Sequence, residues 1–152
     1  VAFTDISRED LELRVASRDL SMVMNEVPGA YASMLGGGSG DSRVSIRGFD
    51  QRNMAIMING VPVNDMENGW VYWSNWDGMA DVTSELQVQR GLGASNLAVA
   101  SVGGTINIKS SAADMDKGYG FKQEVGNDNF LKTTLRASTG LMDNGFAVTA
   151  LF

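Results

Sequence analysis

The segment Met54–Ile58 (MAIMI) is a continuous apolar run that ends at Asn59-Gly60. An apolar run this short, bounded by a turn signal, is typical of a buried β-strand. Asn-Gly is the strongest short-range signal for a hairpin turn, because both residue types tolerate positive φ. Val61-Pro62 continues the chain, and proline is confined to edge strands or turns since it has no N–H to donate. We therefore expect a hairpin turn at Asn59-Gly60, followed by a segment that lies at an edge or in a turn.

Short segments with strand-like alternation recur along the first two thirds of the chain. Alternation of apolar and polar residues predicts strands at 1–6, 44–46, 86–88 and 105–109. A helix is expected at about 17–26, capped by Ser17 and stopped by Pro28-Gly29, and Ser7 with Asp10 resembles a weak capping box. Residues 95–101 could add one or two helical turns. These elements predict an α+β fold, with a small mixed β-sheet, short helices and long loops.

The last part of the chain has a different pattern. The segments 118–126, 130–138 and 145–152 are each strand-sized, and Asn127-Asp128-Asn129 and Asp143-Asn144-Gly145 join them with turn chemistry. Spans of about 9–11 residues with two-residue alternation are required by a transmembrane β-barrel, but any antiparallel meander shows them too. We expect residues 1–113 to form one domain, and residues 114–152 to be a linker followed by antiparallel strands.

Composition excludes several kinds of function. The chain has no Cys and no His, which removes thiol nucleophiles, disulfides, imidazole triads and the usual zinc ligands. A net charge of −6 argues against a nucleic-acid partner, because phosphate contacts need clustered Lys and Arg. Neither glycine-rich stretch, 36–40 or 91–96, matches a nucleotide-binding loop. We expect no catalytic residues, no metal and no cofactor, and thus a protein that is not an enzyme.

Two predicted strands end in Arg-Gly, at Arg47-Gly48 and at Arg90-Gly91. Strand-end arginines are commonly just solvated, with a turn glycine behind them. Arginine is also the cation favoured in buried bidentate pairs with carboxylates. The repeated ending suggests that both guanidinium groups meet one acidic partner surface.

A long segment between these strands is acidic and aromatic. Residues 53–89 contain five acids and no Lys or Arg, and Trp70, Tyr72, Trp73 and Trp76 fall within seven residues. Three interpretations stay open. The rings could pack in the core, they could form a platform for a ligand, or Asp65, Glu67 and Asp77 could belong to a calcium loop, although the EF-hand spacing is not met. A loop of this length is more often functional than idle.

The order of these pieces resembles the plug domain of TonB-dependent outer-membrane receptors. Each motif is weak alone, but together they are specific: VPG at 27–29, IRG at 46–48, INGVP at 58–62, QVQRG at 87–91 and GGTINI at 103–108. The loop at 65–78 looks like versions found in Bacteroidetes-type receptors.

The resemblance implies a location in the cell outer membrane and a fold that fills the lumen of a large barrel. Residues 118–152 would then be the first strands of that barrel. It implies energised import of a bulky ligand, such as an oligosaccharide, a chelated metal or a vitamin. The partners would be the chain's own barrel, TonB through a segment outside residues 1–152, and a surface lipoprotein. Unpaired strand edges in residues 114–152 would let the fragment self-associate.

Site residues follow from the same resemblance. Arg47 and Arg90 match arginines that pair with glutamates on the inner barrel wall. The ligand-facing residues would come from two loops, and they are Phe49, Asp50, Gln51, Arg52, Asn64, Asp65, Glu67, Trp70, Tyr72, Trp73 and Trp76. The acidic loop disfavours an anionic ligand, which leaves polyols, peptides and cationic or chelated species. The rival hypothesis is a freestanding binding module that uses residues 64–78 to bind a glycan.

Overall fold

The computed structural model describes residues 2–15, 18–35, 41–91 and 101–152. It divides into two compact units, Val1–Lys109 and Ser110–Phe152. The domain boundary predicted after residue 113 falls inside the second unit. In the part of the chain that is described, no helix has the length and apolar character to cross a membrane.

The first unit is built on a five-stranded sheet with the order β1-β7-β8-β5-β6. Its strands are β1 (Ala2–Ser7), β5 (Met54–Ile58), β6 (Val61–Pro62), β7 (Glu85–Arg90) and β8 (Gly104–Lys109). Neighbouring strands are antiparallel except β5 and β8, which are parallel, so the predicted mixed sheet is confirmed. The proline-containing β6 is an edge strand, as its missing N–H requires.

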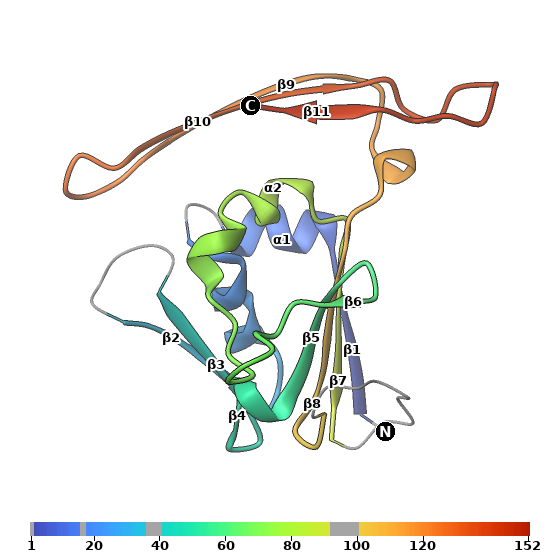
Figure 1. Ribbon diagram of the computed structural model, residues 1–152. Helices are drawn as coiled ribbons and strands as arrows, with labels where there is room; N and C mark the ends of the chain where they lie inside the picture. The colour runs from blue at the N-terminus through green and yellow to red at the C-terminus, as the bar shows by residue number, and fades with distance from the viewer. Residues whose placement is uncertain (1, 16–17, 36–40, 92–100) are drawn as a thin grey trace. The chain divides into compact units, whose positions relative to one another are not determined.

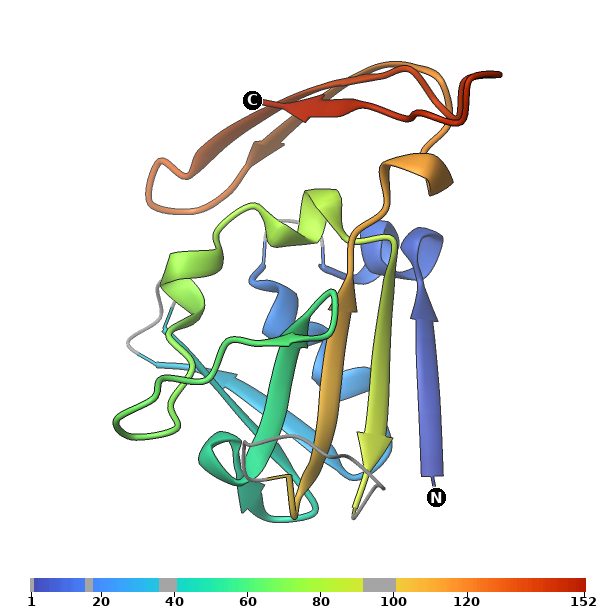
Figure 2. The ribbon, with the colours of Figure 1, turned by 45° about the vertical axis from the view of Figure 1, so that its right-hand side comes forward.

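A smaller antiparallel sheet and several short helices complete this unit. The sheet contains β2 (Ala30–Met34), β3 (Ser42–Ile46) and β4 (Phe49–Asp50). The helices are α1 (Arg8–Val15), α2 (Met79–Val82) and the 3₁₀ helices η1 (Leu20–Glu26), η2 (Gln51–Asn53) and η3 (Trp73–Trp76). Figures 1 and 2 show these elements on one side of the five-stranded sheet.

The helix expected at 17–26 is therefore shorter than predicted and of the 3₁₀ type. Ser17, its expected cap, and most of the expected helical turns at 95–101 lie outside the described residues. The weak capping box is present, because the Asp10 backbone N–H donates to the Ser7 hydroxyl at 3.3 Å where α1 begins.

The core lies against one face of the five-stranded sheet. That face contributes buried side chains from four strands: Ile6, Met54, Ile56, Leu86, Val88, Ile106 and Ile108. The opposite face carries a hydrogen-bonded row of polar side chains. Asn107 Nδ2 donates to Gln87 Oε1 at 3.5 Å, Gln87 Nε2 donates to Glu85 Oε1 at 3.2 Å, and Lys109 Nζ lies 3.0 Å from Glu85 Oε2. The hydrogen bond from Lys109 lowers the pKa of the Glu85 carboxyl.

Two glycines occupy positions in the five-stranded sheet where the backbone requires glycine. Asn59 and Gly60 have φ of 50° and 81°, as a two-residue hairpin turn of the predicted kind requires. At Gly104, where β8 begins, φ is 143° and a Cβ atom would lie 2.3 Å from the Gln89 carbonyl oxygen. Only glycine fits there, because any side chain would overlap the backbone of β7.

The second unit contains η4 (Ala112–Asp114) and a three-stranded antiparallel sheet. Its strands are β9 (Gly118–Val125), β10 (Leu131–Ser138) and β11 (Thr149–Leu151), in the order β11-β10-β9. The third strand is shorter than the predicted 145–152, because residues 145–148 form a bend followed by irregular structure.

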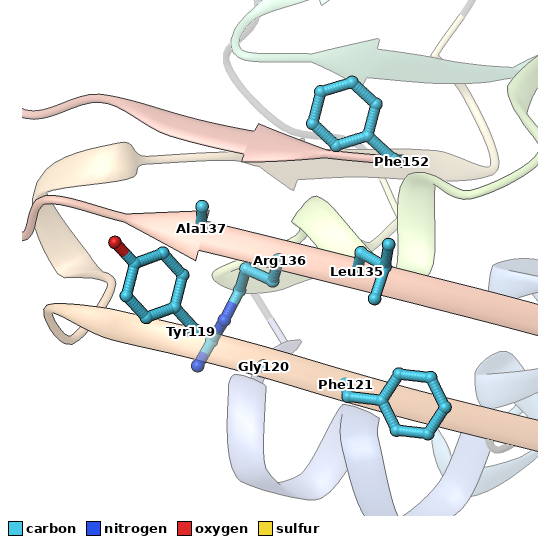
Figure 3. Close-up of a pocket in the computed structure, with 7 residues that line it drawn as sticks. All are labelled: Tyr119, Gly120, Phe121, Leu135, Arg136, Ala137 and Phe152. Atoms are coloured by element: carbon cyan, nitrogen blue, oxygen red, sulfur yellow. The ribbon is translucent and has the colours of Figure 1, made fainter.

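The register of this sheet separates apolar from charged side chains. Leu135 lies opposite Phe121 and Ala137 opposite Tyr119 on one face. This face is exposed, with Tyr119 at 94 % and Phe121 at 69 %. A hollow of about 380 Å³ opens among Tyr119, Gly120, Phe121, Leu135, Arg136, Ala137 and Phe152 (Figure 3). Lys122 and Lys132, which alternate to the other face, form ion pairs with Glu124.

Candidate functional site

The predicted ligand-facing segments meet at one end of the five-stranded sheet. At this end β7 finishes, and β5 and β8 begin, because Gly104 pairs with both Arg90 and Met54. Phe49–Asn53 leads directly into β5, and the loop after β6 returns to the same place. A Cβ atom on Gly69 would lie 3.4 Å from the Arg52 carbonyl oxygen, so the two loops are in contact.

The tip of the second loop is held by its own hydrogen bonds. The Asp65 N–H donates to the Trp70 carbonyl at 2.7 Å, and the Gly69 N–H donates to the Asp65 carbonyl at 2.8 Å. Asp65 Oδ1 accepts the N–H groups of Glu67 and Asn68 at 2.9 and 3.0 Å. The tip therefore presents Met66 and Glu67 to solvent from an ordered turn.

Trp70 lies between this tip and two arginines. The Cζ atoms of Arg52 and Arg43 are 4.7 and 5.3 Å from the centre of its ring, which are cation–π distances. The Tyr72 hydroxyl accepts a hydrogen bond from Asn68 Nδ2 at 3.2 Å. Arg43 was missed as a site residue, because it comes from β3 and no local pattern connects it with a loop 27 positions later.

Three of the predicted ligand contacts are interior residues. Gln51 is fully buried, where its Nε2 donates to the Val71 carbonyl at 3.1 Å and its Oε1 accepts from Trp73 Nε1 at 3.2 Å. Asn64 is also buried and bonds to four backbone groups. Because their polar atoms are satisfied inside the protein, Gln51, Asn64 and Trp73 support the loops and do not form the surface that a ligand would meet.

Of the interpretations of the aromatic segment, core packing describes two of its rings and an exposed platform describes the other two. Trp73 is a core residue and Trp76 packs against the core, whereas Trp70 and Tyr72 reach the surface. For a calcium loop, no group of three or more acidic side chains among the described residues could hold a metal ion. The other predicted ligand-facing residues are exposed or partly exposed: Phe49, Asp50, Arg52, Asp65, Glu67, Trp70, Tyr72 and Trp76.

Arg47 and Arg90 both lie beside the turn at 27–29. Arg90 donates from Nη1 to the Pro28 carbonyl at 2.7 Å and from Nη2 to the Thr4 hydroxyl at 3.0 Å. The Arg47 N–H donates to the Gly29 carbonyl at 2.7 Å, and its Nη1 would lie 3.1 Å from a Cβ atom on Gly91. The buried Nε of Arg90 has no hydrogen-bond partner in the described part of the chain. Neither guanidinium has a carboxylate partner among those residues.

Comparison with known proteins identifies the family. The model of the TonB-dependent receptor plug domain matches residues 1–105. A vitamin B12 transporter of Vibrio vulnificus is 26% identical over 98% of this chain, and a ferric enterobactin receptor of Pseudomonas aeruginosa is 31% identical over 71% of it. The chain spans 25% and 16% of those two proteins. The relatives are transporters and receptors, not enzymes.

Solved structures agree with this match. The unliganded ferric citrate transporter FecA superposes with a TM-score of 0.68 at 27% identity, over 99% of this chain and 24% of that chain. The siderophore receptor PiuA of Acinetobacter baumannii gives 0.66 at 25% identity, over 97% and 20%. The motifs, the mixed sheet and the extent of the family match lead to one conclusion: the chain belongs to the TonB-dependent receptor plug domain family.

Proposed function

We propose that this chain is the plug of an outer-membrane importer, joined to the first strands of its barrel. The first unit occludes the barrel lumen, contributes to the ligand site and gates the energised uptake of a bulky nutrient. An oligosaccharide, a chelated metal or a vitamin would each suit such a receptor. The observation that carries the proposal is the contact between the Phe49–Asn53 segment and the 65–70 tip at one end of the sheet.

The second unit supports the barrel part of the proposal. Its strands carry large apolar side chains on one face and paired charges on the other. In water an exposed face of this kind is unfavourable, but facing lipid it matches the alternation of a transmembrane strand. The polar face would then line the barrel interior.

Arg47 and Arg90 are assigned to the barrel wall. They lie beside one turn, have no carboxylate partner among the described residues, and include a buried Nε without a hydrogen bond. Carboxylates on a surrounding barrel wall would supply the missing ion-pair partners of both guanidinium groups. The other partners we propose are TonB, through a segment outside residues 1–152, and a surface lipoprotein at the ligand-facing end.

A freestanding glycan-binding module is less well supported. Trp73 is buried and Trp76 is partly buried against the core, so half of its aromatic platform is lost. The matches over 98% and 71% of this chain, which span only 25% and 16% of two receptors, also favour a part of a larger protein.

Uptake by the full receptor tests the proposed function. Residues Met66–Asn68 are replaced by Gly-Ser-Gly, which changes the exposed tip and leaves the buried Asn64 and Trp73 in place. We expect nutrient uptake to fall while the amount of receptor in the outer membrane is unchanged. Leu13→Ser is the control, because Leu13 is 82 % exposed on α1, which begins at the other end of the sheet. Normal uptake with the altered tip, or uptake that persists in cells without TonB, would contradict the proposal.

A further inference from the structure

We propose that Asn59-Gly60 is a site of spontaneous deamidation, and that the side chain of Asn107 restrains the reaction. Asparagine is one of the thermolabile residues of proteins. A glycine after it favours deamidation, because the glycine nitrogen is not hindered by a side chain and the backbone rotates freely there. Such a modification would act on the turn between β5 and β6, and it does not depend on the proposed function.

Deamidation at this turn is an intramolecular substitution. The backbone nitrogen of Gly60 gives up its proton and attacks Cγ, the side-chain carbonyl carbon of Asn59. The N–Cγ bond forms, the Cγ–Nδ2 bond breaks, and the Nδ2 group takes up a proton and leaves as ammonia. Water then opens the succinimide ring at either of its carbonyl groups, which gives aspartate or isoaspartate. Water is the only other reactant.

The attacking nitrogen is held by a hydrogen bond. The Gly60 N–H donates to Asn107 Oδ1 at 3.0 Å. This contact stabilises the protonated nitrogen and opposes the rotation that would bring the nitrogen to Cγ of Asn59. The turn backbone adds to the restraint, because the Asn59 N–H donates to the Ile108 carbonyl at 2.8 Å. The fold therefore keeps the two reacting atoms from the geometry that the attack requires.

Asn107 is itself held in place within the five-stranded sheet. It lies on β8, opposite Met57 of β5 and Gln87 of β7. Its Nδ2 donates to Gln87 Oε1 at 3.5 Å, as part of the polar row described above. Only the oxygen of an amide can accept from a backbone N–H, so the contact with Gly60 determines which way the Asn107 amide is turned. The polar row thus directs an acceptor at the turn.

Two other Asn-Gly pairs in the chain, at 68–69 and 144–145, are restrained differently. Their glycine N–H groups donate to backbone carbonyls, of Asp65 in the first pair and of Met142 in the second, both at 2.8 Å. At Asn59-Gly60 the acceptor is a side chain from another strand. A substitution can therefore remove this restraint and leave the other two pairs as internal references.

Modification of Asn59 would disturb the strand pairing that follows the turn. Isoaspartate adds a CH₂ group to the backbone, and the register of a hairpin is fixed by the length of its turn. Ile58 pairs with Val61 across this turn, and the Val63 N–H donates to the Ile56 carbonyl at 2.9 Å. These contacts fix where the loop after β6 begins. The restraint by Asn107 therefore preserves the position of the predicted ligand-facing loop.

Peptide mass spectrometry of the purified full receptor tests the proposal. The receptor is incubated in detergent at mildly alkaline pH, and the acid formed at each Asn-Gly pair is measured over time. We expect Asn107→Ala to speed the deamidation of Asn59 about 5-fold, which corresponds to the loss of a hydrogen bond worth about 1 kcal/mol. The rates at Asn68 and Asn144 should not change. In the unaltered receptor, unfolding in urea should also speed the reaction at Asn59.

Two variants serve as controls. Asn107→Asp keeps a side-chain oxygen that can accept the Gly60 N–H, so Asn59 should react as slowly as in the unaltered receptor. Gln87→Ala removes the neighbouring amide of the polar row but not the acceptor of Gly60. The proposal is overturned if Asn107→Ala leaves the rate at Asn59 unchanged, if either control raises it as much, or if all three pairs accelerate together. It is also overturned if Asn59 reacts no faster in urea than in the folded receptor.

Discussion

Asn64 gives the sharpest test of how the ligand-facing loop is attached to the sheet. Its Oδ1 accepts the Ile56 N–H at 2.9 Å, and its Nδ2 donates to the carbonyls of Met54 and Gly69, both at 3.0 Å. Asn64 is 8 % exposed, and Met54 and Ile56 are fully buried. One side chain therefore bonds to these three backbone groups, two of them in β5, and its Nδ2 also lies 3.5 Å from the Gln51 carbonyl oxygen.

Asn64→Ala leaves these three groups without a partner. A buried polar group that loses its hydrogen bond costs about 1–3 kcal/mol. Water can reach the Gly69 carbonyl more readily than the two β5 groups, since Gly69 is only partly buried. We therefore expect a loss of about 3–5 kcal/mol in the free energy of unfolding. Asn64→Asp should be at least as damaging at neutral pH, because its second oxygen would face the Met54 and Gly69 carbonyls.

Urea unfolding followed by tryptophan fluorescence measures this loss. All three tryptophans lie between residues 70 and 76, so the signal reports the first unit. With a denaturant slope of about 2 kcal/mol/M, the midpoint should fall by about 2 M. Asn68→Ala is the control in the same loop, because Asn68 is exposed and its bonds stay within the tip. If Asn64→Ala lowers the midpoint no more than Asn68→Ala does, the loop is not anchored through Asn64.

Three further predictions concern other parts of the chain. Gly104→Ala should lower the urea midpoint far more than Gly60→Ala, because the new Cβ would overlap the backbone at Gly104, whereas Gly60 has open space and only the left-handed strain of about 1–2 kcal/mol. The pKa of Glu85 is lowered in the folded state, so its contribution to stability is present above its unfolded pKa and lost as pH falls through the folded one. The Glu85→Gln variant should accordingly lose less free energy of unfolding than the unaltered protein between about pH 5 and pH 3. If the free energy of unfolding falls equally in both proteins over this range, the prediction is contradicted. In the full receptor, Phe121→Arg should reduce insertion into the outer membrane, at a cost of about 2–4 kcal/mol if its face meets lipid. Thr134→Arg alternates to the other face and should insert normally, so equal insertion of both would refute the lipid-facing assignment.

Local chemistry was sufficient to predict several elements. Met54–Ile58 is β5 with the predicted bounds, and Asn59-Gly60 forms the expected turn. Both depend on residues adjacent in sequence. The 30–34 segment was missed, because AYASM has no clear apolar alternation and becomes β2 through its pairing with β3.

The candidate site was harder to predict because its decisive contacts are distant in sequence. Trp70 and Trp73 are the same residue type three positions apart, yet one lies beside exposed arginines and the other is buried. The difference comes from Gln51, which accepts the Trp73 N–H, and from Arg43, which reaches Trp70. The residue types marked the aromatic segment 70–76 as a candidate site. Only the packing of β3, η2 and the loop determines which ring faces outward.

The same reasoning applies to the acidic residues of these loops. A carboxylate next to backbone N–H groups is used first by its own turn, since an unpaired N–H is costly and a short acidic side chain reaches it at once. Asp50 and Asp65 are both held in this way. A long arginine has no such local partner, so it extends to an aromatic ring or a distant acid. A count of acids therefore does not show which charged side chains are used inside a loop and which extend away from it.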